Sequence, residues 1–169
     1  MTRFFFILIS LLFTQSSFSQ TLTRVKIGPK IGSSQFKLDY VDGFMPSYSF
    51  GGFIIMDRIG LELKKVKASN FKVPVTNVDR VYSDFDGTTY ALTYNLYTGS
   101  KVNFSWGGGV FVEDYTYIEI PTQSQKGRII TYYISGDILF DVSNRSGFSI
   151  GAELGQNYKS INLGYYLNL

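Results

Sequence analysis

Five charged residues are the part of this sequence that could do chemistry. Lys26 and Lys30 fall on the polar side of an alternating segment near the start of the chain, and Glu113, Asp137 and Glu153 fall on the polar side of three later segments. Side chains two apart on a strand share a face, so the five would project together into a barrel interior. Burying either sign alone is costly, so we predict that they pair and fill this interior. A path for protons or ions is the alternative interpretation.

The acidic residues do not form a catalytic or metal-binding pattern. Glu113 and Glu119 share a face but are six residues apart, roughly 20 Å along an extended strand, whereas paired carboxylates in hydrolysis lie within about 10 Å. Asp84 begins a partial calcium loop, but Asn95 stands where that loop requires a bidentate Glu. We therefore predict no catalytic residue and no metal site.

The composition excludes several classes of function. His is absent, which removes the side chain most readily tuned as a base near neutral pH and the commonest transition-metal ligand. Cys is also absent, so disulfides, thiolate metal sites and a lipid-modified Cys are excluded. A net charge of +3 does not indicate a nucleic-acid surface. The sequence predicts a protein that is not an enzyme and needs no cofactor.

The elements that must position these charges are strands. Apolar and polar residues alternate repeatedly, and no segment of about 11 residues or more shows a helical period. The eight expected strands lie at about 23–33, 47–57, from 61 onward, 88–96, 102–113, 130–140, 148–154 and 161–169. Arg24 shares the inward parity of the two lysines, and Glu62 is a weaker inward addition because the alternation of its strand breaks at Lys64 and Lys65. Pro29 cannot donate to a ladder, so we expect a local bulge there.

The connections between the strands alternate in length. Short turns are expected at 57–60, 98–101 and 143–147, longer polar loops at about 34–46, 68–87 and 117–127, and a short fourth loop near 156–159. Short periplasmic turns and longer external loops are typical of outer-membrane barrels. The long loops would present aromatic residues for contacts with other molecules: Tyr40, Phe44, Tyr82, Phe85, Tyr115 and Tyr117.

The first residues are typical of a signal peptide. Arg3 precedes a run of ten residues, of which nine are apolar, and Ser17 and Ser19 supply the small residues that a signal peptidase needs. An anchoring helix would need about 20 apolar residues. We expect a signal peptide at 1–19 and a barrel domain at 20–169.

The two faces of the strands distinguish a membrane barrel from a soluble one. On the last five strands the polar face is mostly Ala, Thr, Asn, Ser and Gly, small groups that suit a narrow lumen. The opposite face has large aromatic groups that suit lipid, among them Tyr90, Trp106 and Tyr132. We predict an all-β, eight-stranded, antiparallel, up-and-down transmembrane β-barrel. A secreted lipocalin-like barrel that binds an apolar ligand is the alternative.

The opening KIGPKIGSS, the eight short strands and the aromatic closing strand resemble the small outer-membrane barrels of Bacteroidota, the PorT-like group within the OmpA/OmpX-type superfamily. The resemblance implies outer-membrane localisation, contact with outer-membrane lipid, and a non-enzymatic role in envelope anchoring, surface interaction or assistance to secretion. The resemblance also implies a protein partner outside the cell or in the periplasm. Lipid A deacylases, palmitoyl transferases and surface proteases share this architecture but rely on His, which this chain lacks.

Overall fold

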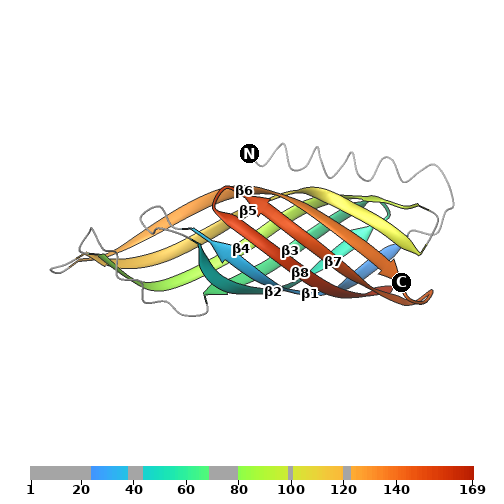
Figure 1. Cartoon of the computed structure of the whole chain (residues 1–169), viewed down its shortest axis with the longest axis horizontal. Coiled ribbons are helices and arrows are strands. Elements are labelled where there is room, and N and C mark those ends of the chain that lie inside the picture. The colour runs from blue at the N-terminus through green and yellow to red at the C-terminus, as the bar shows by residue number, and fades with distance from the viewer. Residues whose placement is uncertain (1–23, 38–43, 69–79, 99–100, 120–122) are drawn as a thin grey trace.

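The protein is an eight-stranded closed barrel. The computed structural model describes residues 24–37, 44–68, 80–98, 101–119 and 123–169, so the expected signal peptide lies outside the described residues. The strands are β1 (Val25–Phe36), β2 (Met45–Met56), β3 (Ile59–Ala68), β4 (Arg80–Leu96), β5 (Val102–Glu119), β6 (Gln123–Asp141), β7 (Ser146–Gly155) and β8 (Tyr158–Asn168). Each pairs antiparallel with the next, and β8 pairs with β1 (Figure 1). The predicted fold class is confirmed.

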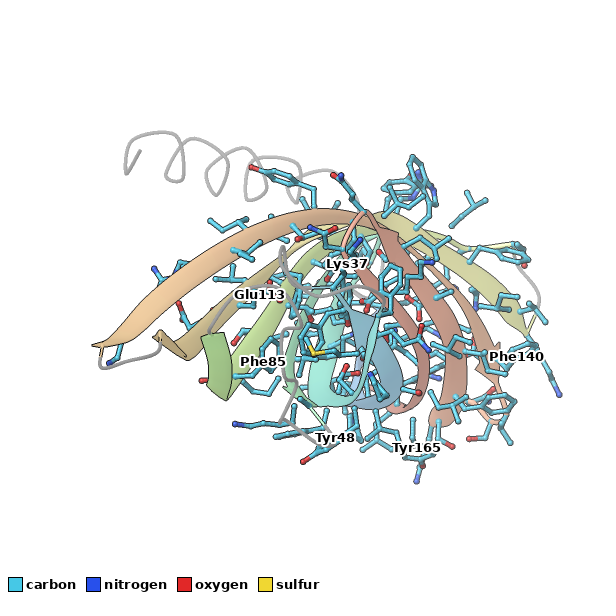
Figure 2. The ribbon with its side chains drawn as sticks, turned by 60° about the vertical axis from the view of Figure 1, so that its left-hand side comes forward. Lys37, Tyr48, Phe85, Glu113, Phe140 and Tyr165 are labelled. Atoms are coloured by element: carbon cyan, nitrogen blue, oxygen red, sulfur yellow. The ribbon has the colours of Figure 1, made fainter. Side chains whose placement is uncertain are left out.

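The barrel is apolar outside and polar inside. On β8, Leu163 and Tyr165 are 55% and 53% exposed, whereas Asn162 on the same strand faces inward and is fully buried. Figure 2 shows Tyr48 and Tyr165 on the outer surface and Glu113 within the curve of the strands. The outward apolar side chains form a continuous band that we call the apolar belt, which includes Ile31, Phe50, Leu61, Leu63, Tyr90, Leu92, Trp106, Tyr132, Ile134, Ile150 and Leu163. Such a surface needs an apolar solvent around it.

Three strands are much longer than the others. β4, β5 and β6 have 17, 18 and 19 residues, and the other five have 10 to 12. They project beyond the rest of the barrel at one end, on the left of Figure 1, which we call the outer end. Much of the loops expected at 68–87 and 117–127 is therefore strand, and this part of the prediction was wrong. Backbone pairing stabilises the additional strand residues, because β5 pairs with both β4 and β6 as far as Glu119.

The opposite end of the barrel has the three short turns, and we call it the turn end. The turn between β2 and β3 consists of Asp57 and Arg58, and Asp57 adopts a positive φ of 52°, a conformation that Asp tolerates better than most residues. Its carboxylate accepts a hydrogen bond from the backbone N–H of Arg24 at 2.9 Å. The fourth connection at the outer end is also short, since only residues 156–157 separate β7 from β8. The expected short connections are confirmed.

The seam between β1 and β8 contains no bulge. Ile27 pairs with Leu167 and Lys30 with Gly164, so the register is the same on both sides of Gly28 and Pro29, which have no pairing to β8. The bulge expected at Pro29 is therefore wrong. Pro29 lacks an N–H, and the ladder between β1 and β8 accommodates it by leaving two residues unpaired, without an inserted residue. A Cβ on Gly28 would overlap the carbonyl oxygen of Tyr165, so only glycine allows this close approach of the two strands. In the described segments, no helix is long and apolar enough to cross a membrane.

Candidate functional site: the charged interior

The five charged residues expected in the interior are all buried there. Lys26 and Lys30 are each 3% exposed, Glu113 and Glu153 are each 1% exposed, and Asp137 is 8% exposed. They lie on β1, β5, β6 and β7, and each occupies the inward parity of its strand. Inward projection follows from strand geometry, but which charges contact one another depends on how the strands are staggered around the barrel.

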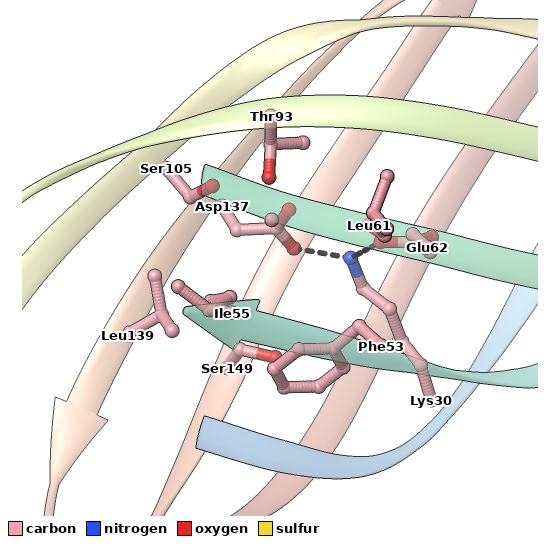
Figure 3. Close-up of a pocket in the computed structure, with 11 residues that line it drawn as sticks. Lys30, Phe53, Ile55, Leu61, Glu62, Thr93, Ser105, Asp137, Leu139 and Ser149 are labelled. Atoms are coloured by element: carbon pink, nitrogen blue, oxygen red, sulfur yellow. Dashed lines mark hydrogen bonds and ion pairs between the residues drawn. The ribbon is translucent and has the colours of Figure 1, made fainter. Parts of the chain in front are cut away.

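Lys30 connects three strands across the lumen. Its Nζ lies 2.6 Å from Oε2 of Glu62 on β3 and 2.7 Å from Oδ1 of Asp137 on β6 (Figure 3). Beside this group is a cavity of about 10 Å³, which is the space of about one water molecule. The lumen is therefore filled by side chains at this level.

Lys64 is the central residue that sequence reasoning missed. It is fully buried, and its Nζ lies 2.8 Å from Glu62 Oε1 and 2.7 Å from Glu153 Oε1. It also donates a hydrogen bond to the side-chain oxygen of Asn162 at 3.1 Å. The alternation of β3 does not break here: Lys64 has the parity of Glu62 and points inward, whereas Lys65 points outward. The spacing of two residues between Glu62 and Lys64 could have indicated this pair.

A second ion pair lies nearer the turn end. Lys26 Nζ is 2.6 Å from Oδ1 of Asp141, the last residue of β6. The same carboxylate accepts hydrogen bonds from the Tyr166 hydroxyl at 3.0 Å and from the Asn103 and Asn168 side-chain amides at 2.9 and 3.2 Å. Asp141 was not among the predicted residues, although it lies four positions after Asp137 and so shares its face.

Two of the sequence expectations about inward and outward side chains were wrong. Arg24 does not enter the lumen: it precedes β1, is exposed, and its guanidinium lies 5.4 Å from the centre of the Tyr97 ring. Phe85 was expected at the external surface but is 6% exposed, because it shares the inward parity of Gly87. Its ring stacks on Phe36 with 4.0 Å between the ring centroids.

Aromatic side chains fill the lumen towards the outer end. Phe111, the bulky exception on the small-residue face of β5, is fully buried and stacks on Tyr158 at 4.5 Å. Phe36, Phe85 and Tyr133 belong to the same cluster. Glu113 is the next inward residue after Phe111 on β5. Because β5 runs towards the outer end, Glu113 lies on the outer side of this aromatic cluster.

Charged residues on the outer surface begin where the apolar belt ends. Arg128 on β6 donates from Nε to Oδ1 of Asp114 on β5 at 2.6 Å, and both side chains are more than half exposed. The hydrogen bond from Arg128 lowers the pKa of Asp114. On β3 and β4, Lys65 lies 3.3 Å from Asp86. These exposed pairs mark the water side of the lipid boundary at the outer end.

The arrangement suits a closed, charge-paired interior. Within the described residues, no three His, Cys, Asp or Glu side chains come together in a way that could hold a metal ion. The lipocalin-like alternative is contradicted by the faces, because a soluble barrel has its polar face in water and an apolar cavity inside. Here the apolar belt is outside, and lysines and carboxylates fill the middle of the lumen.

The comparisons with known proteins concern the fold. No family model matches the chain, and no curated protein matches it. The structure is similar to that of Ail, the attachment invasion locus protein of Yersinia pestis, with a TM-score of 0.62 and 11% identity over 88% of this chain and 100% of Ail. It is also similar to the N-terminal β-barrel domain of Pseudomonas aeruginosa OprF, with a TM-score of 0.54 and 15% identity over 86% of this chain and 97% of that domain. Neisserial surface protein A gives a TM-score of 0.56 and 11% identity over 86% of this chain and 96% of its own.

The chain therefore has the fold of the small outer-membrane β-barrels. The apolar belt agrees with this fold, since its side chains would otherwise face water. The localisation that fits both observations is the outer membrane.

Proposed function

We propose that the mature chain, residues 20–169 after removal of a signal peptide at 1–19, is a non-enzymatic outer-membrane protein that acts by binding another protein at the cell surface. The observation that supports this function is the projecting sheet formed by the outer halves of β4, β5 and β6. Short turns at the opposite end favour an orientation with the projecting sheet outside the cell.

The projecting sheet has two edges without a neighbouring strand in the described part of the chain. The pairing of β3 with β4 stops at Val66 and Gly87, and that of β6 with β7 stops at Tyr133 and Gly155. Beyond these pairs, β4 and β6 still pair with β5, and no strand of the described residues pairs with their other side. The unpaired N–H and C=O groups of such an edge can bind an extended segment of a partner.

The interior supports a surface role in preference to transport. Lys30 contacts carboxylates of β3 and β6, Lys64 contacts Glu62 of its own strand and Glu153 of β7, and the space left beside Lys30 is that of about one water. Eight strands leave little room beyond what side chains fill. We interpret the ion pairs that Lys26, Lys30 and Lys64 form with Glu62, Asp137, Asp141 and Glu153 as a structural plug. Glu113 is a further buried charge of this interior and lies beyond the aromatic cluster, towards the outer end.

Among the roles implied by the resemblance to PorT-like barrels of Bacteroidota, surface interaction fits the projecting sheet most directly. Assistance to secretion would use the same sheet on a secreted partner, and envelope anchoring would not require it. The absence of His supports the non-enzymatic part of this proposal.

The test shortens the projecting sheet and leaves the barrel intact. Residues 115–127 are replaced by Asn-Gly, a two-residue hairpin turn that follows Asp114 and precedes its partner Arg128. The shortened protein is expected to insert in the outer membrane and to show heat-modifiable migration. It is also expected to fail to restore the surface-binding or secretion phenotype of a strain from which the gene has been deleted. Full restoration by the shortened protein would refute the proposed role of the sheet.

The plug variant Lys64→Met serves as the comparison. If the phenotype depends on the sheet, any folded Lys64→Met protein restores it, because the substitution changes only the interior.

A further inference from the structure

The turn end of the barrel contains an open basin of about 590 Å³. This end is on the right of Figure 1, opposite the projecting sheet. Its size lies within the range of sites that hold small molecules, roughly 300 to 1,000 Å³. The polar and aromatic residues that line it include Arg24, Lys26, Tyr97, Lys101, Asp141 and Asn168.

The floor of the basin is electrostatically balanced. Asp141 forms the ion pair with Lys26 and accepts hydrogen bonds from Tyr166, Asn103 and Asn168. A carboxylate with four such donors has no need of a further cation, and its negative charge is cancelled locally by Lys26. The floor therefore neither requires nor strongly repels a charged ligand.

The rim of the basin has two exposed cations, one of which lies beside the carboxylate of Asp57. Arg24 and Lys101 are both exposed, and neither forms an ion pair with a carboxylate of the described segments. Arg24 is held at the rim by two contacts, the hydrogen bond from its backbone N–H to Asp57 and the position of its guanidinium over the Tyr97 ring. The backbone of Lys101 is fixed as well, because its carbonyl accepts a hydrogen bond from Asp141 N–H at 2.7 Å. Both cations thus project from anchored backbone beside one cavity.

We propose that this basin is a binding site for a soluble anion with two negative charges and a polar body, of the class of the sugar phosphates. The guanidinium of Arg24 and the ammonium of Lys101 would bind the phosphate, since both groups form charge-assisted hydrogen bonds with it. Ser143, Asn144 and Asn168 line the same basin and offer hydroxyl and amide groups to the polar body. In the proposed orientation the site faces the periplasm, and the Lys26–Asp141 pair forms part of its floor.

The experiment uses the mature protein refolded in an uncharged maltoside detergent, where no lipid phosphate is present. Calorimetric titration with glucose 6-phosphate at an ionic strength of about 0.15 M, where the Debye length is about 8 Å, is expected to show one site, and titration with glucose is expected to show none. In the double variant Arg24→Gln/Lys101→Gln the dissociation constant should rise by about tenfold or more, as the loss of charged hydrogen bonds requires. Heat-modifiable migration checks that the variant is folded.

Arg145→Gln is the matched control. Arg145 is an exposed residue of the turn between β6 and β7, at the same end of the barrel, but it does not line the basin. Removing its charge should change the dissociation constant by about twofold or less, the effect of a screened charge outside the site. The proposal is overturned if the double variant binds like the parent, if Arg145→Gln weakens binding as much as the double variant does, or if glucose binds equally well. It is also overturned if binding occurs only to vesicles that contain anionic phospholipid, since the basin would then recognise a lipid headgroup.

Discussion

Replacing Lys64 with Met should destabilise the barrel strongly. Lys64 is fully buried and is the cation that contacts both Glu62 and Glu153. Met is similar in length, so the substitution removes the charge with little change in volume. Glu62 retains Lys30, but Glu153 is left with the hydroxyl of Tyr158 at 3.0 Å and Lys64 no longer compensates its charge. Removing one partner of a buried ion pair costs about 3 to 5 kcal/mol, and we expect a loss in this range.

Urea unfolding in lipid vesicles measures this loss. Trp106 is the single Trp of the chain and lies in the apolar belt, so its fluorescence reports departure from lipid. The control is Lys65→Met, at the neighbouring residue, whose side chain is about half exposed and whose Nζ lies 3.3 Å from the exposed carboxylate of Asp86. Such a surface pair contributes about 0 to 1 kcal/mol, so this variant should unfold almost like the parent.

A double variant separates charge from packing. Lys64→Met/Glu153→Gln removes both charges of the pair, and it should be more stable than the sum of the two single changes predicts, by about 1 to 3 kcal/mol. If Lys64→Met has the parental unfolding midpoint, or if Lys65→Met is the more damaging change, the interior charges do not stabilise the barrel as the ion-pair geometry indicates.

Three other predictions test the apolar belt and the filled lumen. The mature chain should fractionate with the outer membrane and migrate differently on gels before and after boiling, and recovery in the soluble periplasmic fraction would contradict the apolar belt. In planar bilayers the purified protein should give no stable porin-scale conductance, because side chains of the plug fill the lumen. Leu92→Arg, in the apolar belt, should cost about 2 to 4 kcal/mol in the same urea assay, whereas Thr93→Ser, on the inward face, should cost about 1 kcal/mol or less. Equal stability of these two variants would show that the faces are wrongly assigned.

The sequence indicates the strands well where they cross lipid. In that region every outward position must be apolar and most inward positions must be small or polar, so alternation marks the strand clearly, as Tyr90 and Leu92 do on β4. Above the lipid boundary this requirement ends. Outward positions there are occupied by residues such as Asp86, Asp114 and Arg128, and nothing in the local pattern distinguishes strand from loop. The outer halves of β4 to β6 are strand because they pair with one another, which is a long-range property.

The missing members of the interior network have a related explanation. Lys64 and Asp141 share the parity of Glu62 and Asp137, so their inward direction could be predicted from strand geometry. Their partners could not be predicted in this way. Lys30 contacts Asp137 across the lumen, a distance of 107 positions in the sequence, because the tilt and stagger of the strands bring the two to one level. Such cross-lumen contacts depend on the shear of the whole barrel.

A filled lumen restricts where the protein can act. The ion pairs of Lys30 and Lys64 and the aromatic cluster around Phe111 fill the lumen of the described barrel with side chains, so we expect its two ends to function separately. The ends are also chemically different. At the outer end, edges of a sheet offer backbone hydrogen bonds, which suit an extended polypeptide. At the turn end, the side chains of Arg24 and Lys101 border a cavity and form no ion pair with a described carboxylate, which suits a small anion. Ligands at the two ends are therefore expected to bind independently, and the hairpin replacement at 115–127 should leave the affinity of the basin for glucose 6-phosphate unchanged.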